Sequence, residues 1–248
     1  MPHQRSVDTP KQNAVFVASH RRSGTHLTLD SLVANFDCFE SGFQNFDAEN
    51  CKLNAGLYKT HMDGNEASRF LNPESKVIYV VRDGRDVMVS LFNYAKTHDS
   101  SVRDMKFSEF LRSPNPYACS EEFKGLSRVA FWSRHVESWL SREDVPVQVV
   151  TFDGWKNSFR QLLSELGQFL EVSPKSTPKS MVMKPGQNWS KKLLRKVGLL
   201  KTTAIQFRGG RSDVWKEHFD SESLDYFSKE SEKTYQLVSD KVGPGFGL

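Results

Sequence analysis

Near the start of the chain, a short stretch carries the side chains best suited to binding an anion. It holds two arginines, two hydroxyl side chains, two histidines and a glycine, in the order His20, Arg21, Arg22, Ser23, Gly24, Thr25 and His26. An apolar run precedes the stretch and an amphipathic segment follows it. N–H groups at the start of a helix lack partners within the helix and bind anions there. The stretch therefore predicts a cradle for a phosphate or sulfate group; the alternative is an ordinary turn whose arginines face water.

A second set of polar side chains lies where a short strand is expected to end. The β-rich segment 56–61 closes on Lys59, Thr60 and His61. In α/β folds, ligands bind outside the carboxyl ends of the parallel strands. A lysine and a histidine at this position could therefore meet the anion cradle. The alternative is a strand end on the surface, where a lone histidine is more often inert than catalytic.

A third set follows the most apolar strand of the chain, residues 76–82. Arg82 stands at its tip, a turn rich in acidic residues comes next, and Ser90 lies two turns into the following helix. The planar guanidinium group suits phosphate because it donates paired hydrogen bonds. The alternatives are an ion pair between Arg82 and Asp86, and a packing role for Ser90.

The alternation of strands and helices predicts how these side chains meet. Strands are expected at residues 14–18, 56–61, 76–82 and 147–152. Helices are expected after residue 24, at 87–94, at 121–140 and at 221–238, and a further helix is expected to follow Asn157, which would be its N-terminal cap. Such alternation predicts a single α/β domain with a parallel β-sheet flanked by helices. Residues 98–120 are expected to be irregular, and residues 172–206 to form a lid. His135 is expected to be a core or surface histidine, with a substrate contact as the alternative.

The composition is that of an ordinary globular protein. The chain has 248 residues, of which 38% are hydrophobic and 26% charged, and its net charge of +4 is too small to indicate a nucleic-acid partner. Cys38, Cys51 and Cys119 have no metal-ligand spacing, and their odd number argues for a reducing compartment. No apolar run is long enough to span a membrane and no signal peptide is visible. We expect a disordered tail over residues 1–13 and one domain over residues 14–248.

Four ordered segments resemble the motifs of the sulfotransferases that use 3′-phosphoadenosine 5′-phosphosulfate (PAPS). Residues 20–25 lie over the 5′-phosphosulfate loop, usually Tyr-Pro-Lys-Ser-Gly-Thr, with Arg22 in the place of its lysine. Residues 59–61 repeat a Lys-Thr-His segment of that family. Residues 77–90 are similar to its 3′-phosphate motif, in which an arginine and a serine have the spacing of Arg82 and Ser90. Residues 207–216 resemble its segment Arg-Lys-Gly-x-x-Gly-Asp-Trp-Lys, although they could also form a flexible glycine turn.

The resemblance implies a role for individual residues. His61 would be the general base, Lys59 would contact the transferring sulfuryl group, and Arg22 would stabilise the sulfuryl oxygens and the leaving phosphate. The residues implied to bind the cofactor are Arg21, Arg22, Ser23, Gly24, Thr25, His26, Arg82, Ser90, Phe152, Arg208, Gly209 and Gly210. No metal is implied, and the product of the donor would be 3′,5′-ADP (PAP).

The chain departs from the family pattern at several of these positions. Arg22 is always charged, so it cannot donate a proton to a leaving group as lysine can. Leu27 stands where many relatives have a tryptophan that stacks on the adenine, so the adenine must find another aromatic ring, in Phe152 or Trp189. Phe152 itself stands where relatives often have a tyrosine, so the hydrogen bond of the ring hydroxyl is lost and only packing remains. Asp213 comes one place early, which leaves the local backbone open.

The resemblance implies the nucleotide-kinase-like fold that sulfotransferases share with P-loop enzymes. It also implies transfer of a sulfuryl group from PAPS to a hydroxyl or amine of a small-molecule acceptor. We expect a cytoplasmic enzyme of bacterial type, with no nucleic-acid or membrane partner; assembly into a homodimer is left open. One alternative is a nucleotide-dependent kinase, but the Gly-Lys-[Ser/Thr] of a Walker A loop is missing after Gly24. The other is a non-catalytic nucleotide-binding module.

Overall fold

A five-stranded parallel sheet runs through the computed structural model, which describes residues 13–46, 54–118, 120–182, 212–243 and 246. The strand order is β2-β3-β1-β4-β5. The strands are β1 (Ala14–Ala18), β2 (Gln44–Asn45), β3 (Gly56–Thr60), β4 (Lys76–Val81) and β5 (Val147–Thr151). All paired strands are parallel, so their carboxyl ends share one edge of the sheet. The predicted fold class, a parallel sheet flanked by helices, is confirmed.

Strand β1 lies between the two other strands that carry candidate site residues. In the register, Ala18 pairs with Thr60 of β3 on one side and with Tyr79 of β4 on the other. β1 is buried along its whole length, as is all of β4 after Lys76. Strands covered on both faces need apolar side chains at nearly every position, which explains why these two segments are continuous apolar runs. The loop after β1 is therefore held between the tips of β3 and β4.

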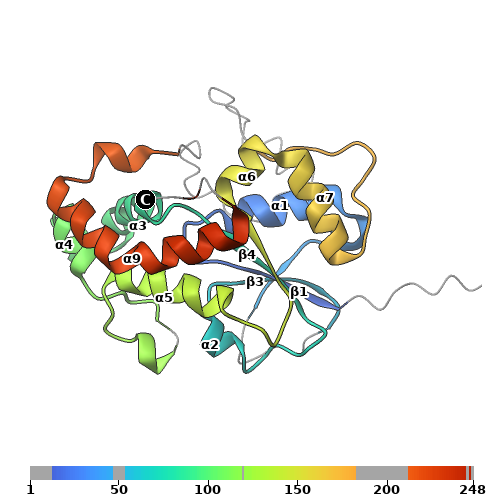
Figure 1. The fold of residues 1–248 in the computed structure, drawn as a ribbon, viewed down its shortest axis with the longest axis horizontal. Coiled ribbons are helices and arrows are strands. Elements are labelled where there is room, and N and C mark those ends of the chain that lie inside the picture. The colour runs from blue at the N-terminus through green and yellow to red at the C-terminus, as the bar shows by residue number, and fades with distance from the viewer. Residues whose placement is uncertain (1–12, 47–53, 119, 183–211, 244–245, 247–248) are drawn as a thin grey trace, which may run out of the picture.

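Helices cover both faces of the sheet, as Figure 1 shows. They are α1 (Thr25–Asn35), α2 (Gly64–Ala67), α3 (Gly84–His98), α4 (Phe107–Arg112), α5 (Arg128–Leu140), α6 (Phe152–Asn157), α7 (Phe159–Leu170) and α9 (Ser221–Val242), with 3₁₀ turns η1 (Asp37–Phe39), η2 (Ser100–Val102), η3 (Glu121–Phe123) and η4 (Val214–Glu217). Successive strand residues point to opposite faces. Phe16 therefore packs in a core with residues of α3, α5 and α9, and Val17 packs in a second core with residues of α1 and α7.

The structure differs from the sequence predictions at several element boundaries. The helix expected at 121–140 begins at Arg128, because Gly125 has a left-handed φ of 79° and the side chain of Ser127 accepts a hydrogen bond from the N–H of Ala130. The segment expected to be irregular, 98–120, contains α4, whose Phe110 and Leu111 are buried. The expected cap at Asn157 is wrong, since that residue ends α6.

The chain that follows β3 is attached to α5 by close packing at Gly64. Its N–H donates to Ser138 Oγ at 2.8 Å, and a Cβ at this glycine would lie 2.6 Å from the main-chain carbon of Ser138. The packing leaves no room for a side chain, so α2 and α5 lie in direct backbone contact. This contact sets the distance between α5 and the strand end that carries His61.

We predict that Gly64→Ala lowers the free energy of unfolding by about 3 kcal/mol, because the added methyl group must push two backbones apart. Gly42→Ala is the control: its φ is +89°, but a Cβ there would meet nothing within 4 Å. It should cost about 1 kcal/mol, from the left-handed backbone alone. Urea unfolding of the three proteins measures both values. An equal loss in the two variants would contradict the packing argument.

Candidate active site

The loop that links β1 to α1 is a tight turn with two left-handed residues. Arg22 has a φ of 72° and Gly24, at the N-terminal cap of α1, has a φ of 105°. A Cβ at Gly24 would lie 2.6 Å from a ring carbon of Phe152. Position 24 therefore requires glycine for two reasons, the positive φ and the absence of space for a side chain. Gly24, the N-cap residue, has no side chain with which to cap the first turn of α1. The N–H groups of that turn are therefore left to bind another acceptor, as the anion cradle requires.

The side chains of this loop divide into buried and outward-facing groups. Ser23 and Thr25 are buried, and Thr25 Oγ1 lies 2.6 Å from Ser19 Oγ. His20 is also buried, with Nδ1 2.8 Å from the main-chain oxygen of Arg21. The Thr25 hydroxyl and the His20 imidazole thus hold the loop together. The N–H of Ser23 donates to the main-chain oxygen of His20 at 3.3 Å and closes the turn, whereas Thr25, at the start of α1, can offer its backbone N–H to an anion.

His61 is held in the tautomer that a general base needs. Its Nδ1 lies 2.8 Å from the main-chain oxygen of Ser19, and only a protonated nitrogen can bond to a carbonyl oxygen. Nδ1–H therefore donates, and Nε2 keeps its lone pair. Burial, together with the smaller effects of the charges of Lys59 and Arg21, lowers the pKa of His61 to about 3 against the opposing effect of the hydrogen bond to Ser19. The imidazole is neutral near pH 7 and can accept a proton.

Positive side chains crowd together around His61. Burial and the neighbouring charge of Arg21 lower the pKa of Lys59, which is half-buried. Burial, Lys59 and Arg22 lower the pKa of His26 to about 4. Each of these shifts disfavours a further positive charge at the site. A bound anion would relieve the repulsion among the cations, so the site favours a ligand with several negative charges.

The two arginines of the loop point to different neighbours. Arg22 Nε donates to Ser90 Oγ at 3.1 Å, and its guanidinium lies 5.3 Å from the ring centroid of Tyr94. The guanidinium of the exposed Arg21 instead lies 4.4 Å from the ring centroid of Tyr117. Arg22 thus joins the group around Ser90, whereas the charge of Arg21 acts on Lys59 and His61.

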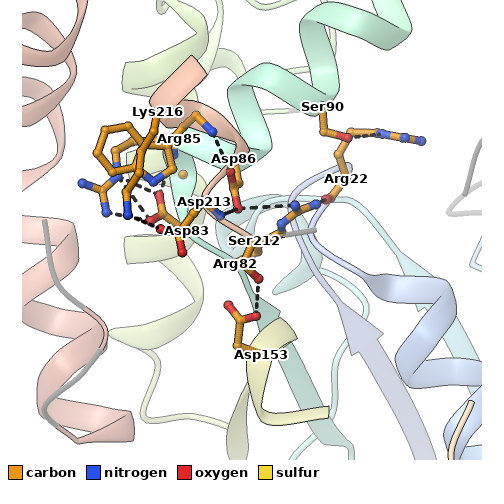
Figure 2. A network of polar contacts seen from close by, with 12 residues as sticks. Arg22, Arg82, Asp83, Arg85, Asp86, Ser90, Asp153, Ser212, Asp213 and Lys216 are labelled. Carbon is orange, nitrogen blue, oxygen red and sulfur yellow. Dashed lines mark hydrogen bonds and ion pairs between the residues drawn. The ribbon is translucent and has the colours of Figure 1, made fainter. Parts of the chain in front are cut away.

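Arg82 connects this loop to the rest of the site. Its guanidinium lies 3.5 Å from the main-chain oxygen of Arg22, 3.5 Å from the carboxylate of Asp86 and 4.5 Å from the ring centroid of Phe152. Figure 2 shows Arg82 between Asp86 and Arg22, with Ser90 next to Arg22. The structure therefore brings Arg22, Arg82 and Ser90 together, and it contains the alternative Arg82–Asp86 ion pair as well.

Phe152 occupies a different environment from the one expected of an adenine-binding ring. It is 3% exposed, with Arg82 over its face and Gly24 against its edge. In this arrangement the ring supports the guanidinium of Arg82. Contact between Phe152 and an adenine stays a prediction.

A second histidine, His135, lies directly behind His61, a contact that the sequence pattern did not predict. Its side chain is completely buried, so of the two expected positions, core or surface, it occupies the core. Its Nε2 lies 3.2 Å from the main-chain oxygen of His61, and its Nδ1 lies 3.0 Å from the hydroxyl of Tyr79. Nε2–H donates to the carbonyl, so Nδ1 accepts from the tyrosine. The contact depends on how α5 packs on the sheet, so no local pattern reveals it.

Some predicted residues lie outside the described part of the chain, namely Trp189, Arg208, Gly209 and Gly210. In the described ranges, no group of three or more His, Cys, Asp or Glu side chains could hold a metal ion. No helix of these ranges is long and apolar enough to cross a membrane.

Comparison with known proteins identifies relatives along most of the chain. A family model described as a sulfotransferase domain matches residues 36–239. The amine sulfotransferase of Oryctolagus cuniculus is 23% identical over 243 residues, which cover 90% of this chain and 75% of the relative. The human sulfotransferase 2A1 is 26% identical over 169 residues, which cover 64% of this chain and 56% of the relative. The chain thus spans little more than half of the length of the human relative.

Solved structures show the same fold. Mouse sulfotransferase SULT7A1 complexed with PAP has a TM-score of 0.58 at 17% identity, over 94% of this chain and 86% of that protein. Retinol dehydratase in complex with androsterone and the inactive cofactor PAP has a TM-score of 0.53 at 16% identity, over 90% of this chain and 80% of that protein. The segment matched by the family model contains Lys59, His61, Arg82 and Ser90, whereas residues 20–26 precede it.

We predict that the unfolding free energy falls as the pH drops from about 7 to about 5. The folded chain lowers the pKa of His20, His26, His61 and His135, so the unfolded chain binds protons first below pH 6.5. For the buried His135, with a pKa of about 4, the stabilisation is full above pH 6.5. It is lost toward pH 4, at about 1.4 kcal/mol per unit. Asp30, whose pKa burial raises to about 6, opposes this trend.

Urea unfolding at several pH values measures this dependence. His135→Asn should reduce the slope, whereas the control His98→Asn, at the exposed end of α3, should keep it. A wild-type stability that stays constant or rises toward pH 5 would contradict the prediction.

Proposed function

The chain belongs to the sulfotransferase domain family, and we propose that it transfers a sulfuryl group from PAPS to a hydroxyl or amine of a small-molecule acceptor. The observation that carries the proposal is the position of His61. Its Nδ1–H is fixed on the main-chain oxygen of Ser19, immediately before the arginine-containing loop, and its Nε2 can accept a proton. A neutral base beside a cluster of cations is suited to deprotonating an acceptor next to an anionic donor.

The residues around the loop fit the donor's charge. Arg82 and Ser90 would hold the 3′-phosphate, and Arg22 bridges them through its main-chain oxygen and its Nε. The crowded cations Arg21, Arg22 and Lys59 favour a ligand with several negative charges, as argued above. Both solved structures described above are complexes with PAP, which supports a donor of the same class here.

In the proposed reaction, each group of the chain has a distinct task. PAPS supplies the sulfuryl group and leaves as PAP. His61 Nε2 takes the proton of the acceptor as its oxygen or nitrogen bonds to sulfur. Lys59, Arg22 and the N–H groups at the start of α1 stabilise the negative charge that develops on the oxygens. Arg22 cannot give up a proton, so it stabilises the leaving phosphate by charge and hydrogen bonding alone.

Aromatic side chains from the segments around the site are candidates for contact with the acceptor. Phe39 is buried in the core that includes α1 and α7, and Phe46 packs against Phe16, so both have structural roles. Phe43 lies 5.9 Å from the ring of His26, and Tyr117 lies beneath Arg21. Both are half-buried. They suit a small acceptor that carries a ring. The cytoplasmic location and the homodimer stay predictions.

We predict that 3′,5′-ADP binds more tightly than 5′-ADP or MgATP in calorimetric titration. Arg82→Ala should weaken 3′,5′-ADP binding by about tenfold to a hundredfold, because a charge-assisted hydrogen bond is worth about 1.5–3 kcal/mol. Arg69→Ala is the control, since that arginine pairs with Glu66 on the surface. Indifference to the 3′-phosphate, or a preference for MgATP, would favour a kinase and exclude this proposal.

We predict that His61→Asn lowers the transfer rate by about 10²–10⁴-fold while 3′,5′-ADP binding is retained. Asparagine can keep a donor to the oxygen of Ser19 but has no nitrogen at the position of Nε2. The release of PAP from PAPS is measured with a panel of phenols, alcohols and amines, and His98→Asn serves as the control. An unchanged rate in His61→Asn would reject His61 as the base. Wild-type binding without any turnover would indicate a non-catalytic binding module.

A further inference from the structure

Asp86 is a buried carboxylate near the start of α3 that binds a distant part of the chain. It is 3% exposed. Its Oδ2 accepts from the N–H of Asp213 at 3.0 Å and lies 3.5 Å from the Arg82 guanidinium, and its Oδ1 accepts from the N–H of Trp215 at 3.1 Å. Figure 2 shows the carboxylate between Arg82 and the main chain of residues 212–216. Both of its oxygens are therefore in use.

Residues 212–216, here called the fastened segment, need an acceptor for the main-chain N–H groups at the start of η4. Asp213 has a left-handed φ of 64°, and no side chain of its own turn caps η4. A buried carboxylate that accepts two main-chain N–H groups supplies the missing cap from another element. The fastened segment is thus hydrogen-bonded to α3 through its own main chain, and these two bonds do not depend on which side chains the segment carries.

Two further contacts hold the same segment. The hydroxyl of Ser212 binds Asp153 of α6 and lies 2.7 Å from Lys156 Nζ. The indole of Trp215 lies 4.1 Å from the guanidinium of Arg85, which is itself held by Asp83. The fastened segment is therefore attached to α6 at one end and to the first turn of α3 at the other, with Asp86 in between.

We propose that Asp86 is a positioning residue, which couples Arg82 to the fastened segment and so gives the nucleotide site its preference for a 3′-phosphate. The inference rests on the proposed function. One carboxylate orients the arginine that would bind the 3′-phosphate and fixes the fastened segment, which begins two positions after Gly210 in the sequence. Loss of one acceptor oxygen would loosen both partners together. A simple helix-capping role for Asp86 would affect stability but not nucleotide preference.

The test compares the affinity for 3′,5′-ADP with that for 5′-AMP, which lacks only the 3′-phosphate. Asp86→Asn keeps the shape but has only one acceptor oxygen, so the ratio of the two affinities should fall at least tenfold. Hydrogen exchange of peptides covering residues 212–219 should become faster. The control Asp225→Asn removes a surface carboxylate paired with Lys229 and should change neither readout.

Ser212→Ala is a second variant that tests the same affinity ratio, and it serves if Asp86→Asn folds poorly. It releases the other end of the fastened segment without touching Asp86, and it should shift the affinity ratio in the same direction. An unchanged ratio in both variants would overturn the inference. A wild-type protein with no preference for 3′,5′-ADP would instead overturn the proposed function itself.

Discussion

The parallel pairing of β1 with both β3 and β4 is the constraint on which the site depends. It places three strand tips at one edge of the sheet, with the loop after β1 in the middle. The main-chain oxygen of Ser19 can then reach His61, and that of Arg22 can reach Arg82. If β3 and β4 ran antiparallel to β1, their carboxyl ends would lie at the other edge of the sheet, away from the loop after β1. The core on both faces of β1 and β4 therefore stabilises the site as well as the fold.

Arg82 converts this arrangement into a connected network. From the end of β4 it contacts the loop, the first turn of α3 and the ring of Phe152 at the start of α6. Glycine at position 24 allows the loop to approach that same ring. The arginine thus has a fixed orientation before any ligand binds. Such preorganisation reduces the conformational entropy that binding must overcome.

The histidines at the site are kept neutral, and the cations there remain close together. Burial lowers the pKa of His61 and of His135, while Arg21 and Lys59 add repulsion at His61. The chain therefore stores unfavourable electrostatic energy that an anion can release. A polyanionic donor would both fill the site and raise the basicity of His61, because the field of the cations would then be compensated.

The sequence by itself determined the strands β1, β3, β4 and β5, most of the long helices and the candidate residues. The continuous apolar runs of β1 and β4 predicted a buried parallel sheet, and the resemblance of residues 77–90 to a family motif implied that Arg82 and Ser90 belong to one site. The first inference rests on local periodicity, which the backbone geometry of a strand fixes, and the second rests on the order and spacing of residues along the motif.

Only the tertiary structure decided which groups touch. It put Arg21 on Tyr117 and Arg22 on Ser90, although the two arginines are neighbours in sequence. It placed His135 behind His61, and it made Asp86 the acceptor for two N–H groups more than a hundred residues away. These contacts join segments that are distant in the chain. They follow from how the helices pack on the sheet, which no local pattern of residues encodes.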